Sequence, residues 1–227
     1  MSHIRPALFD FFRDLDANNH REWFLANKHR YEADVKEPLL RLIVDFTGLL
    51  GEISTRFRAI PKVGGSLFRI YRDVRFSKDK RPYKTAAGVH FRHEAGKNAH
   101  APGFYLHLGP EEVFAAVGIW GPDTRTLTRI RQAIVNEPDT WESVTVDPAF
   151  TAMFTTAFDG ESLKRAPRGF DPNHRFITDL KRKHFVVSAA LSEGEACHAD
   201  FLERLARIYG NGSDFMEFLT RAIGLEW

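Results

Sequence analysis

The sequence predicts an α+β fold in which helices at both ends of the chain flank a mainly antiparallel sheet. Apolar side chains recur at three- and four-residue steps in the first fifty residues and again after residue 200, as in helices packed on a core. The middle of the chain instead contains alternating segments separated by short turns. Strands joined by hairpins run antiparallel, so a doubly wound arrangement is not expected.

Length and composition indicate one globular domain spanning residues 1–227. The hydrophobic share of 43% and the charged share of 27% are typical of globular proteins. No run approaches the roughly 18 apolar residues of a membrane helix, and the N-terminus lacks the apolar core of a signal peptide. We therefore expect a cytoplasmic protein with no membrane partner, while the residues do not indicate an oligomeric state.

Three helices are expected before residue 51. Phe9, Phe12 and Leu15 share one side of a first helix that ends near Asn18-Asn19, because asparagine favours caps and turns. Apolar residues from Trp23 to Tyr31 predict a second helix. Proline is favoured in the first turn of a helix, so Pro38 can begin the third, which carries Leu39, Leu42, Ile43, Phe46, Leu49 and Leu50.

The central segments predict strands. Gly64 and Gly65 break the helical pattern before a strand-like run at residues 66–71, and residues 85–93 alternate as in a half-buried strand. Residues 104–108 and 113–120 then form a hairpin with its turn at Pro110-Glu111. If Leu108 lies opposite Val113, one face of the hairpin is apolar and the other carries Tyr105 and His107.

Helices dominate the rest of the chain. Pro122 or Asp123 begins one helix, and Asp147-Pro148 is typical of a second helix start. A basic loop at residues 164–170 precedes a helix over 174–180, a short strand over 185–188 and the C-terminal helices.

Residues 69–84 are the most unusual segment of the chain. Seven cations against two anions leave a local charge of +5, whereas the whole chain carries +2. Arginine offers planar pairs of donors that match phosphate or carboxylate, and lysine offers mobile charges. We expect an anion-binding loop with Arg69, Arg72, Arg75, Lys78, Lys80, Tyr83 and Lys84 as ligand-binding residues.

A structural interpretation of the same segment stays open beside the functional one. Asp73 lies between Arg72 and Arg75, so it is expected to form a structural ion pair that holds an irregular loop. A third alternative is a charged run that only meets solvent. In the structural interpretation, Asp73→Asn would be strongly destabilising.

The polar face of the predicted strands supplies further candidates. We expect His90, Arg92, Tyr105 and His107 to be neighbours if the three strands form a meander. Arg92 and Tyr105 would then bind ligand, and His90 and His107 are the candidate catalytic residues, because imidazole titrates near neutral pH.

Metal and cofactor sites are not expected. His90 and His93 face opposite sides of one strand, and His100 falls in a loop, so the histidines do not form a ligand set. Phosphate-loop and dinucleotide-binding motifs are absent. Cys197 is the single cysteine, and its neighbour His198 would point about 100° away on a helix, so an inert thiol is expected.

The segment from Arg69 to Tyr83 resembles the signature of a bacterial family of unknown function, domain of unknown function 2461. The pattern R-x-x-R-D-x-R-F-x-x-x-K-x-P-Y is complete, and similar passages surround Asn18-Asn19, Gly103 to His107 and Asp179 to Phe185. The resemblance spans nearly the whole chain and so implies one domain, but it implies no activity.

Two classes of function remain as predictions. The first is a protein that binds a phosphorylated or carboxylated ligand, with hydrolase or transferase chemistry as its enzymatic form. The alternative is a non-catalytic module that binds nucleic acid or a protein, with the basic segment serving as an ion-pair network.

Overall fold

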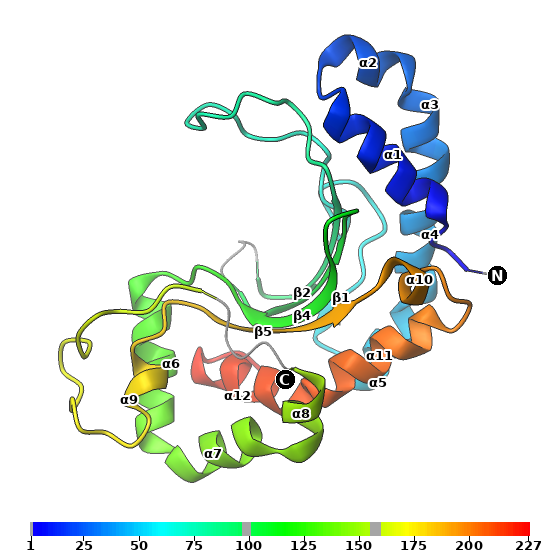
Figure 1. The fold of residues 1–227 in the computed structure, drawn as a ribbon. Coiled ribbons are helices and arrows are strands. Elements are labelled where there is room, and N and C mark those ends of the chain that lie inside the picture. Colours follow the sequence, from blue (N-terminus) through cyan, green and yellow to red (C-terminus); the bar gives the residue numbers. More distant parts are fainter. Residues whose placement is uncertain (1, 97–100, 155–159) are drawn as a thin grey trace.

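The computed structural model describes residues 2–96, 101–154 and 160–227, and it confirms the predicted α+β architecture. One antiparallel sheet has its strands side by side in chain order (Figure 1). The strands are β1 (Phe57–Arg58), β2 (Ala87–His93), β3 (Gly103–Leu108), β4 (Val113–Ile119) and β5 (Phe185–Leu191).

The N-terminal helices stand at one end of the sheet (Figure 1). Pro38 lies in the first turn of its helix, as predicted, although the chain enters that turn from a π-helical segment. The helices are α1 (Pro6–Ala17), α2 (Arg21–Ala26), α3 (Lys28–Arg30), the π-helix η1 (Tyr31–Lys36), α4 (Glu37–Asp45) and α5 (Thr47–Ile53).

The remaining helices lie before and after β5. Asp123 and Asp147 each accept a backbone hydrogen bond at a helix start, from Thr126 and Phe150 respectively, which confirms both predicted starts. These helices are α6 (Thr124–Asn136), α7 (Pro138–Val146), α8 (Pro148–Met153), α9 (Ile177–Leu180), α10 (Glu193–Ala196), α11 (Phe201–Asn211) and α12 (Ser213–Ala222).

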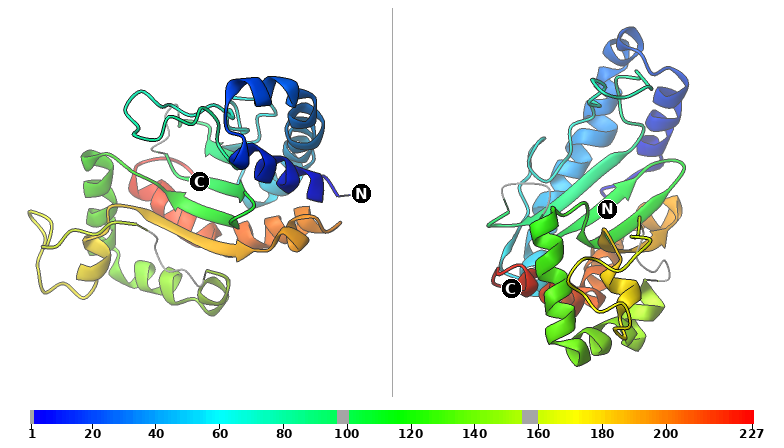
Figure 2. Two further views of the ribbon diagram at one scale, coloured as in Figure 1. Left: turned by 45° about the horizontal axis from the view of Figure 1, so that its top comes forward. Right: turned by 90° about the vertical axis from the view of Figure 1, so that its left-hand side faces the viewer.

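The two faces of the sheet differ as predicted. Leu108 lies opposite Val113, which places Val89, Phe104 and other apolar side chains of one face in the core. Helices α11 and α12 pack on β4 beneath this face (Figures 1 and 2). The opposite side is hollowed, and we call it the concave face; it comprises Gly88, His90, Arg92, Gly103, Tyr105, His107, Phe114, Ala116, Gly118, Trp120, His184, Val186 and Ser188.

The prediction of a regular strand at residues 66–71 is wrong. Leu67 forms isolated bridges with Val63 and Val89, while Phe68 N donates to Gly88 O at 2.9 Å. The segment therefore lines the edge of β2 for three residues. It then leaves the sheet because the chain pairs with itself, with Arg72 N donating to Pro82 O at 2.9 Å and Lys84 N donating to Ile70 O at 2.8 Å.

The predicted helix at 174–180 is shorter than expected. Regular helix covers only Ile177–Leu180, because the His174 ring accepts the Phe176 N–H and holds the preceding residues in a turn. The strand predicted at 185–188 extends instead to Leu191. Within the described ranges, no helix is long and apolar enough to cross a membrane.

Candidate functional site

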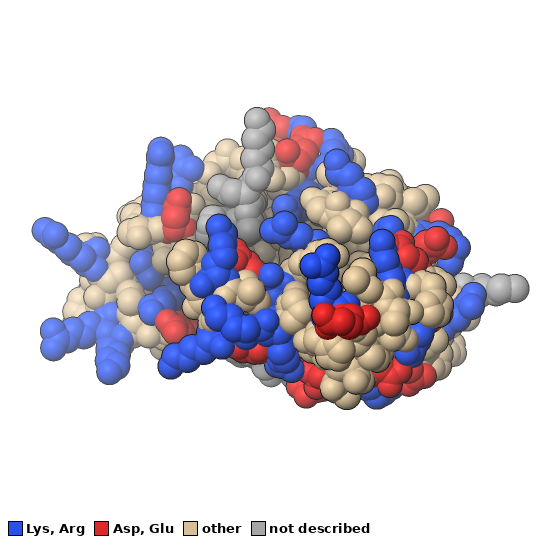
Figure 3. Space-filling model, turned by 90° about the horizontal axis from the view of Figure 1, so that it is seen from above, with Lys and Arg blue, Asp and Glu red and all other residues tan. Residues whose placement is uncertain are grey.

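Residues 69–84 form an extended, self-paired segment that projects over the concave face, and we call it the arm (Figure 1). Seen from above, Lys and Arg side chains predominate on the side of the molecule away from the N-terminus, which includes the arm and the loop after residue 160, whereas acidic side chains are interspersed over the N-terminal helices (Figure 3). The +5 segment is therefore placed beside the open face of the sheet rather than in a tail.

An aspartate inside the arm ties it together. The Asp79 carboxylate accepts from Arg72 Nη1 at 2.6 Å, from Arg81 Nε at 3.0 Å and from the Arg81 backbone N–H at 3.0 Å. These hydrogen bonds, the backbone one foremost, hold the pKa of Asp79 well below its usual range. Arg72 and Arg81 are therefore committed to a carboxylate.

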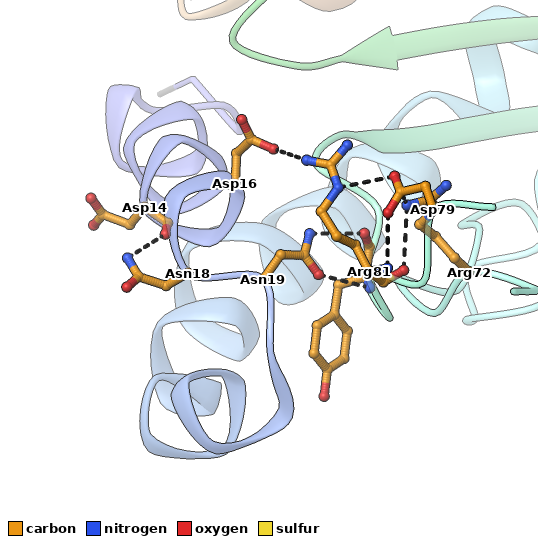
Figure 4. A network of polar contacts seen from close by, with 8 residues as sticks. Asp14, Asp16, Asn18, Asn19, Arg72, Asp79 and Arg81 are labelled. Atoms are coloured by element: carbon orange, nitrogen blue, oxygen red, sulfur yellow. Dashed lines mark hydrogen bonds and ion pairs between the residues drawn. The ribbon is translucent and has the colours of Figure 1, made fainter. Parts of the chain in front are cut away.

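The arm is also fastened to the turn between α1 and α2 (Figure 4). Arg81 Nη1 donates to Asp16 Oδ1 at 2.6 Å. The Asn19 side chain makes two hydrogen bonds to the main chain of Tyr83, accepting from its N–H and donating to its carbonyl, both at 3.1 Å. The Asn18-Asn19 turn thus has a long-range partner that its sequence does not reveal.

Tyr83 belongs to the core rather than to an open surface. Its side chain is 3% exposed and its ring stacks on Phe24, with 4.2 Å between ring centroids. The sequence predicts Tyr83 among the ligand-binding residues. Its position instead makes it the hydrophobic anchor of the arm.

Asp73 forms an ion pair with an arginine, as predicted, but the pair lies at the surface. It forms a two-bond pair with Arg75, at 2.9 Å to Nε and 2.7 Å to Nη2, and both side chains are more than half exposed. These bonds lower the pKa of Asp73, but the pair joins residues only two positions apart. An exposed local pair contributes little to stability, so the anchoring role passes to Asp79.

The tip of the arm is open to solvent. Phe76 is 95% exposed, Lys78 is exposed, and Lys80 Nζ donates to the Val74 carbonyl at 2.9 Å. None of these three side chains reaches the concave face through a contact within the described ranges.

The predicted neighbours on the concave face do lie together. His90 is opposite Tyr105 in the β2–β3 register. Arg92 Nε donates to His90 Nδ1 at 3.0 Å, and the Tyr105 hydroxyl lies 3.1 Å from His107 Nδ1. Gly103 faces this group, and a Cβ there would overlap His90 Nε2. A residue with a side chain at position 103 would therefore displace the His90 ring from its observed position.

Phe68 gathers two cations at the base of the arm. Lys84 Nζ lies 5.1 Å and Arg92 Cζ 5.6 Å from the centre of its ring, while His90 meets the ring edge-on. Burial and, secondarily, the Arg69 charge lower the pKa of Lys84. The ion pairs of the arm involve Arg72, Arg75 and Arg81; among the described residues none includes Arg69, Lys84 or Arg92.

The two candidate catalytic histidines have different surroundings. Burial, with a smaller contribution from Arg92, lowers the pKa of His90 to about 4, so this ring is neutral at pH 7 and accepts from Arg92. Burial also lowers the pKa of His107, and Glu112, 3.7 Å from Nε2, partly opposes that effect. His107 lines a cavity of about 490 Å³ between the β3–β4 hairpin and α1.

Metal and thiol chemistry find no support in the described ranges. These contain no cluster of three His, Cys, Asp or Glu side chains suited to a metal ion, and His100 lies outside them. Cys197 is half-buried, and burial raises the pKa of its thiol. His198 pairs with Asp200 at 2.5 Å rather than with the thiol.

Comparison with known proteins agrees with the sequence signature. A family model described as a conserved hypothetical protein, DUF2461, matches residues 7–218. The chain belongs to the DUF2461 family. No curated protein and no solved structure matches it.

The fixed positions of the DUF2461 signature have different places in this chain. Arg72 and Tyr83, together with the Pro82 carbonyl, fasten the arm. Arg69 is exposed, and its charge acts on Lys84 and on Asp73. The other fixed positions, Asp73, Arg75, Phe76 and Lys80, are exposed along the arm. The signature therefore describes a brace and an exposed, mainly cationic segment.

Several residues of this site were missed in the sequence. Asp79 was counted only as a charge, and Asp16 and Asn19 had no visible link to the arm because more than sixty residues separate them from Arg81 and Tyr83. Phe68 was assigned to a strand without a role. One signal in the sequence could have indicated its role. In an extended segment, neighbouring side chains point to opposite sides, so Phe68 lies on the side away from the core if Leu67 faces the core.

Proposed function

We propose that the concave face binds an anionic ligand, with a phosphate or carboxylate group held by Arg92, Lys84 and Arg69. The observation that carries this proposal is the pair of cations at the Phe68 ring, Lys84 and Arg92, which form no ion pair in the described ranges. The charge of Arg69 acts on Lys84 and so adds to this cluster. Clustered like charges repel one another, so an anion placed among them would gain favourable interactions with each.

The surroundings of Arg92 support its role as the main contact. Its Nε hydrogen is committed to His90 Nδ1, which orients the guanidinium and leaves the Nη groups for a second partner. Forked donors of this kind match the paired oxygens of phosphate or carboxylate. His90 acts here as a positioning residue for Arg92. A neutral imidazole can have this role because its unprotonated Nδ1 accepts the hydrogen bond from Arg92.

Replacement of Arg92 should weaken the binding of inorganic phosphate measured by calorimetry. We expect a loss of at least about tenfold for Arg92→Ala, the equivalent of one charge-assisted hydrogen bond. Arg75→Ala is the matched control, since Arg75 is exposed and already paired with Asp73, and its effect should stay within about twofold. Equal losses in both variants would show that only net charge matters and would contradict the site.

Acid–base chemistry beside this site is the second candidate, favoured by the cavity that His107 lines. The Tyr105 hydroxyl fixes the His107 ring, and a lowered pKa keeps the ring neutral and able to accept a proton at pH 7. The enzyme would then be a hydrolase or transferase acting on the bound anion.

This candidate is tested with p-nitrophenyl phosphate as a general ester substrate. His107→Gln should lower kcat by about 100-fold or more, the range for loss of a general base. His90→Gln should mainly raise KM, because it disturbs Arg92. Because the folded pKa of His107 is lowered, the rate should decline only as pH falls below about 6.5. A rate unaffected by His107→Gln would exclude this role.

A cytoplasmic location and the alternative of a non-catalytic nucleic-acid or protein module stay predictions. The braced half of the arm fits the ion-pair network of that alternative, while the unpaired cations favour a ligand.

A further inference from the structure

An exposed tryptophan extends the concave face beyond the cationic cluster. Trp120 directly follows Ile119, the last residue of β4, whose side chain is in the core, and the Trp120 side chain is 60% exposed on the opposite side. One side of the indole stacks on His184, with 4.2 Å between ring centroids and 15° between ring planes. Large aromatic side chains are usually well buried, so an indole that is supported on one side and exposed on the rest suits a second stacking partner.

His184 is itself fixed in place. Its Nδ1 accepts the Gly121 N–H at 2.8 Å. The backbone of Gly160 lies against the ring, where a Cβ would come within 2.5 Å of His184 Cδ2. Because the supporting ring is held on two sides, the orientation of the Trp120 indole is set before any ligand arrives, which reduces the entropy lost on binding.

The strand register relates Trp120 to Arg92. Arg92 lies opposite Gly103, and Gly103 lies opposite Gly118, so two strand spacings of about 4.8 Å separate Arg92 from Gly118. Trp120 is two residues further along β4, about 7 Å, which places the Cα atoms of Arg92 and Trp120 about 12 Å apart. An arginine side chain, a phosphate and a nucleoside can together span such a distance.

The residues between Arg92 and Trp120 on this face have small side chains or none. Gly103 and Gly118 lack side chains, and the next residue along β4 on the same face is Ala116. The His90 ring lies over Gly103, where an added Cβ would overlap His90 Nε2, and Ala116 is buried. A sugar between the cationic cluster and the indole would therefore rest on the His90 ring and on these small residues.

We infer that the ligand is a nucleotide whose phosphate binds Arg92 and Lys84 and whose base stacks on Trp120. This inference rests on the proposed function, because the same cations hold the phosphate. Base stacking on an aromatic side chain needs only the π-face of the base, so it identifies a nucleotide without selecting one base. The nucleotide can be free or part of a single strand, and the two sources share this chemistry.

The experiment compares AMP with ribose 5-phosphate, which has the phosphate and sugar but no base. The wild-type protein should bind AMP more tightly, and Trp120→Ala should weaken AMP binding roughly 5- to 150-fold, the range for one stacked base. Binding of ribose 5-phosphate should not change. Trp120→Phe should retain part of the preference for AMP, and Phe76→Ala, an exposed ring on the arm, is the control that should leave it intact.

The outcomes separate the two proposals. Equal affinity for AMP and ribose 5-phosphate, or AMP binding unaffected by Trp120→Ala, overturns the nucleotide inference, while Arg92-dependent phosphate binding would still uphold the anion site. Absence of Arg92-dependent binding for every phosphate compound overturns both. A ten-residue oligodeoxyadenylate that binds more than about tenfold tighter than AMP assigns the site to a strand, and equal affinity assigns it to the free nucleotide; either result supports the inference.

Discussion

Tyr83→Ala is expected to lower the free energy of unfolding by about 3–5 kcal/mol, the range for removing a large buried ring. The ring is 3% exposed, stacks on Phe24 and lies 5.4 Å from the Tyr71 ring. Both hydrogen bonds from Asn19 go to the main chain of residue 83, so they are retained in the alanine variant. The decrease in the free energy of unfolding therefore measures the contribution of the Tyr83 ring alone. It is determined from the midpoint of urea unfolding.

Tyr83→Phe is the matched control because it keeps the ring and removes only the hydroxyl. Its stability should stay within about 1 kcal/mol of the wild type. If the alanine variant were as stable as the phenylalanine variant, the ring would not anchor the arm. Tyr83 would then return to the list of candidate ligand contacts.

Asp79→Asn is expected to release the arm while the rest of the domain stays folded. The asparagine amide keeps one oxygen but loses the charge that attracts Arg72 and Arg81. Backbone amides of residues 69–84 should then exchange hydrogen about tenfold faster or more, because local opening becomes easier. Hydrogen exchange read by mass spectrometry localises the effect to this segment.

Asp73→Asn is the control of the same chemistry in the same segment. Among the described residues its carboxylate accepts hydrogen bonds from Arg75 alone, two positions away and exposed, so exchange in the arm should hardly change. A large effect of Asp73→Asn with none of Asp79→Asn would reverse the two roles and restore the expectation drawn from the sequence.

Acid provides an independent check on Asp79. Its pKa is lowered in the folded protein, so its contribution is fully present above the unfolded value of about 3.9 and is lost as pH falls toward the folded value. The arm of the wild type should therefore stay protected at pH 5 and become exposed only below about pH 4. Asp79→Asn should abolish this pH dependence of arm opening.

The brace and the open surface have distinct physical causes. Asp16, Asn19 and Asp79 satisfy the cations and backbone groups that hold the arm in place. Lys84 and Arg92, which form no ion pair with any residue that the structure describes, meet at Phe68 on the concave face. A uniformly basic loop would distribute its charge evenly, whereas this arrangement concentrates it beside Tyr105 and His107.

The sequence by itself determined the fold class. It also predicted that His90, Arg92, Tyr105 and His107 are neighbours, on the condition that Leu108 pairs with Val113 and that the three strands form a meander, and the register meets both conditions. Side-chain alternation along a strand is a local property, and a two-residue hairpin turn sets the register of its arms, so both can be derived without knowledge of distant segments.

Only the tertiary structure decided which charges of the arm are neutralised. Asp73 and Asp79 have similar local surroundings in the sequence, yet Asp79 faces Arg72 and Arg81 in the folded arm while Asp73 meets Arg75 at the surface. The distant partners of Arg81 and Tyr83 come from the last turn of α1 and from the turn that follows it. Such contacts join residues far apart in the chain, and their strength depends on burial and distance, which no local pattern encodes.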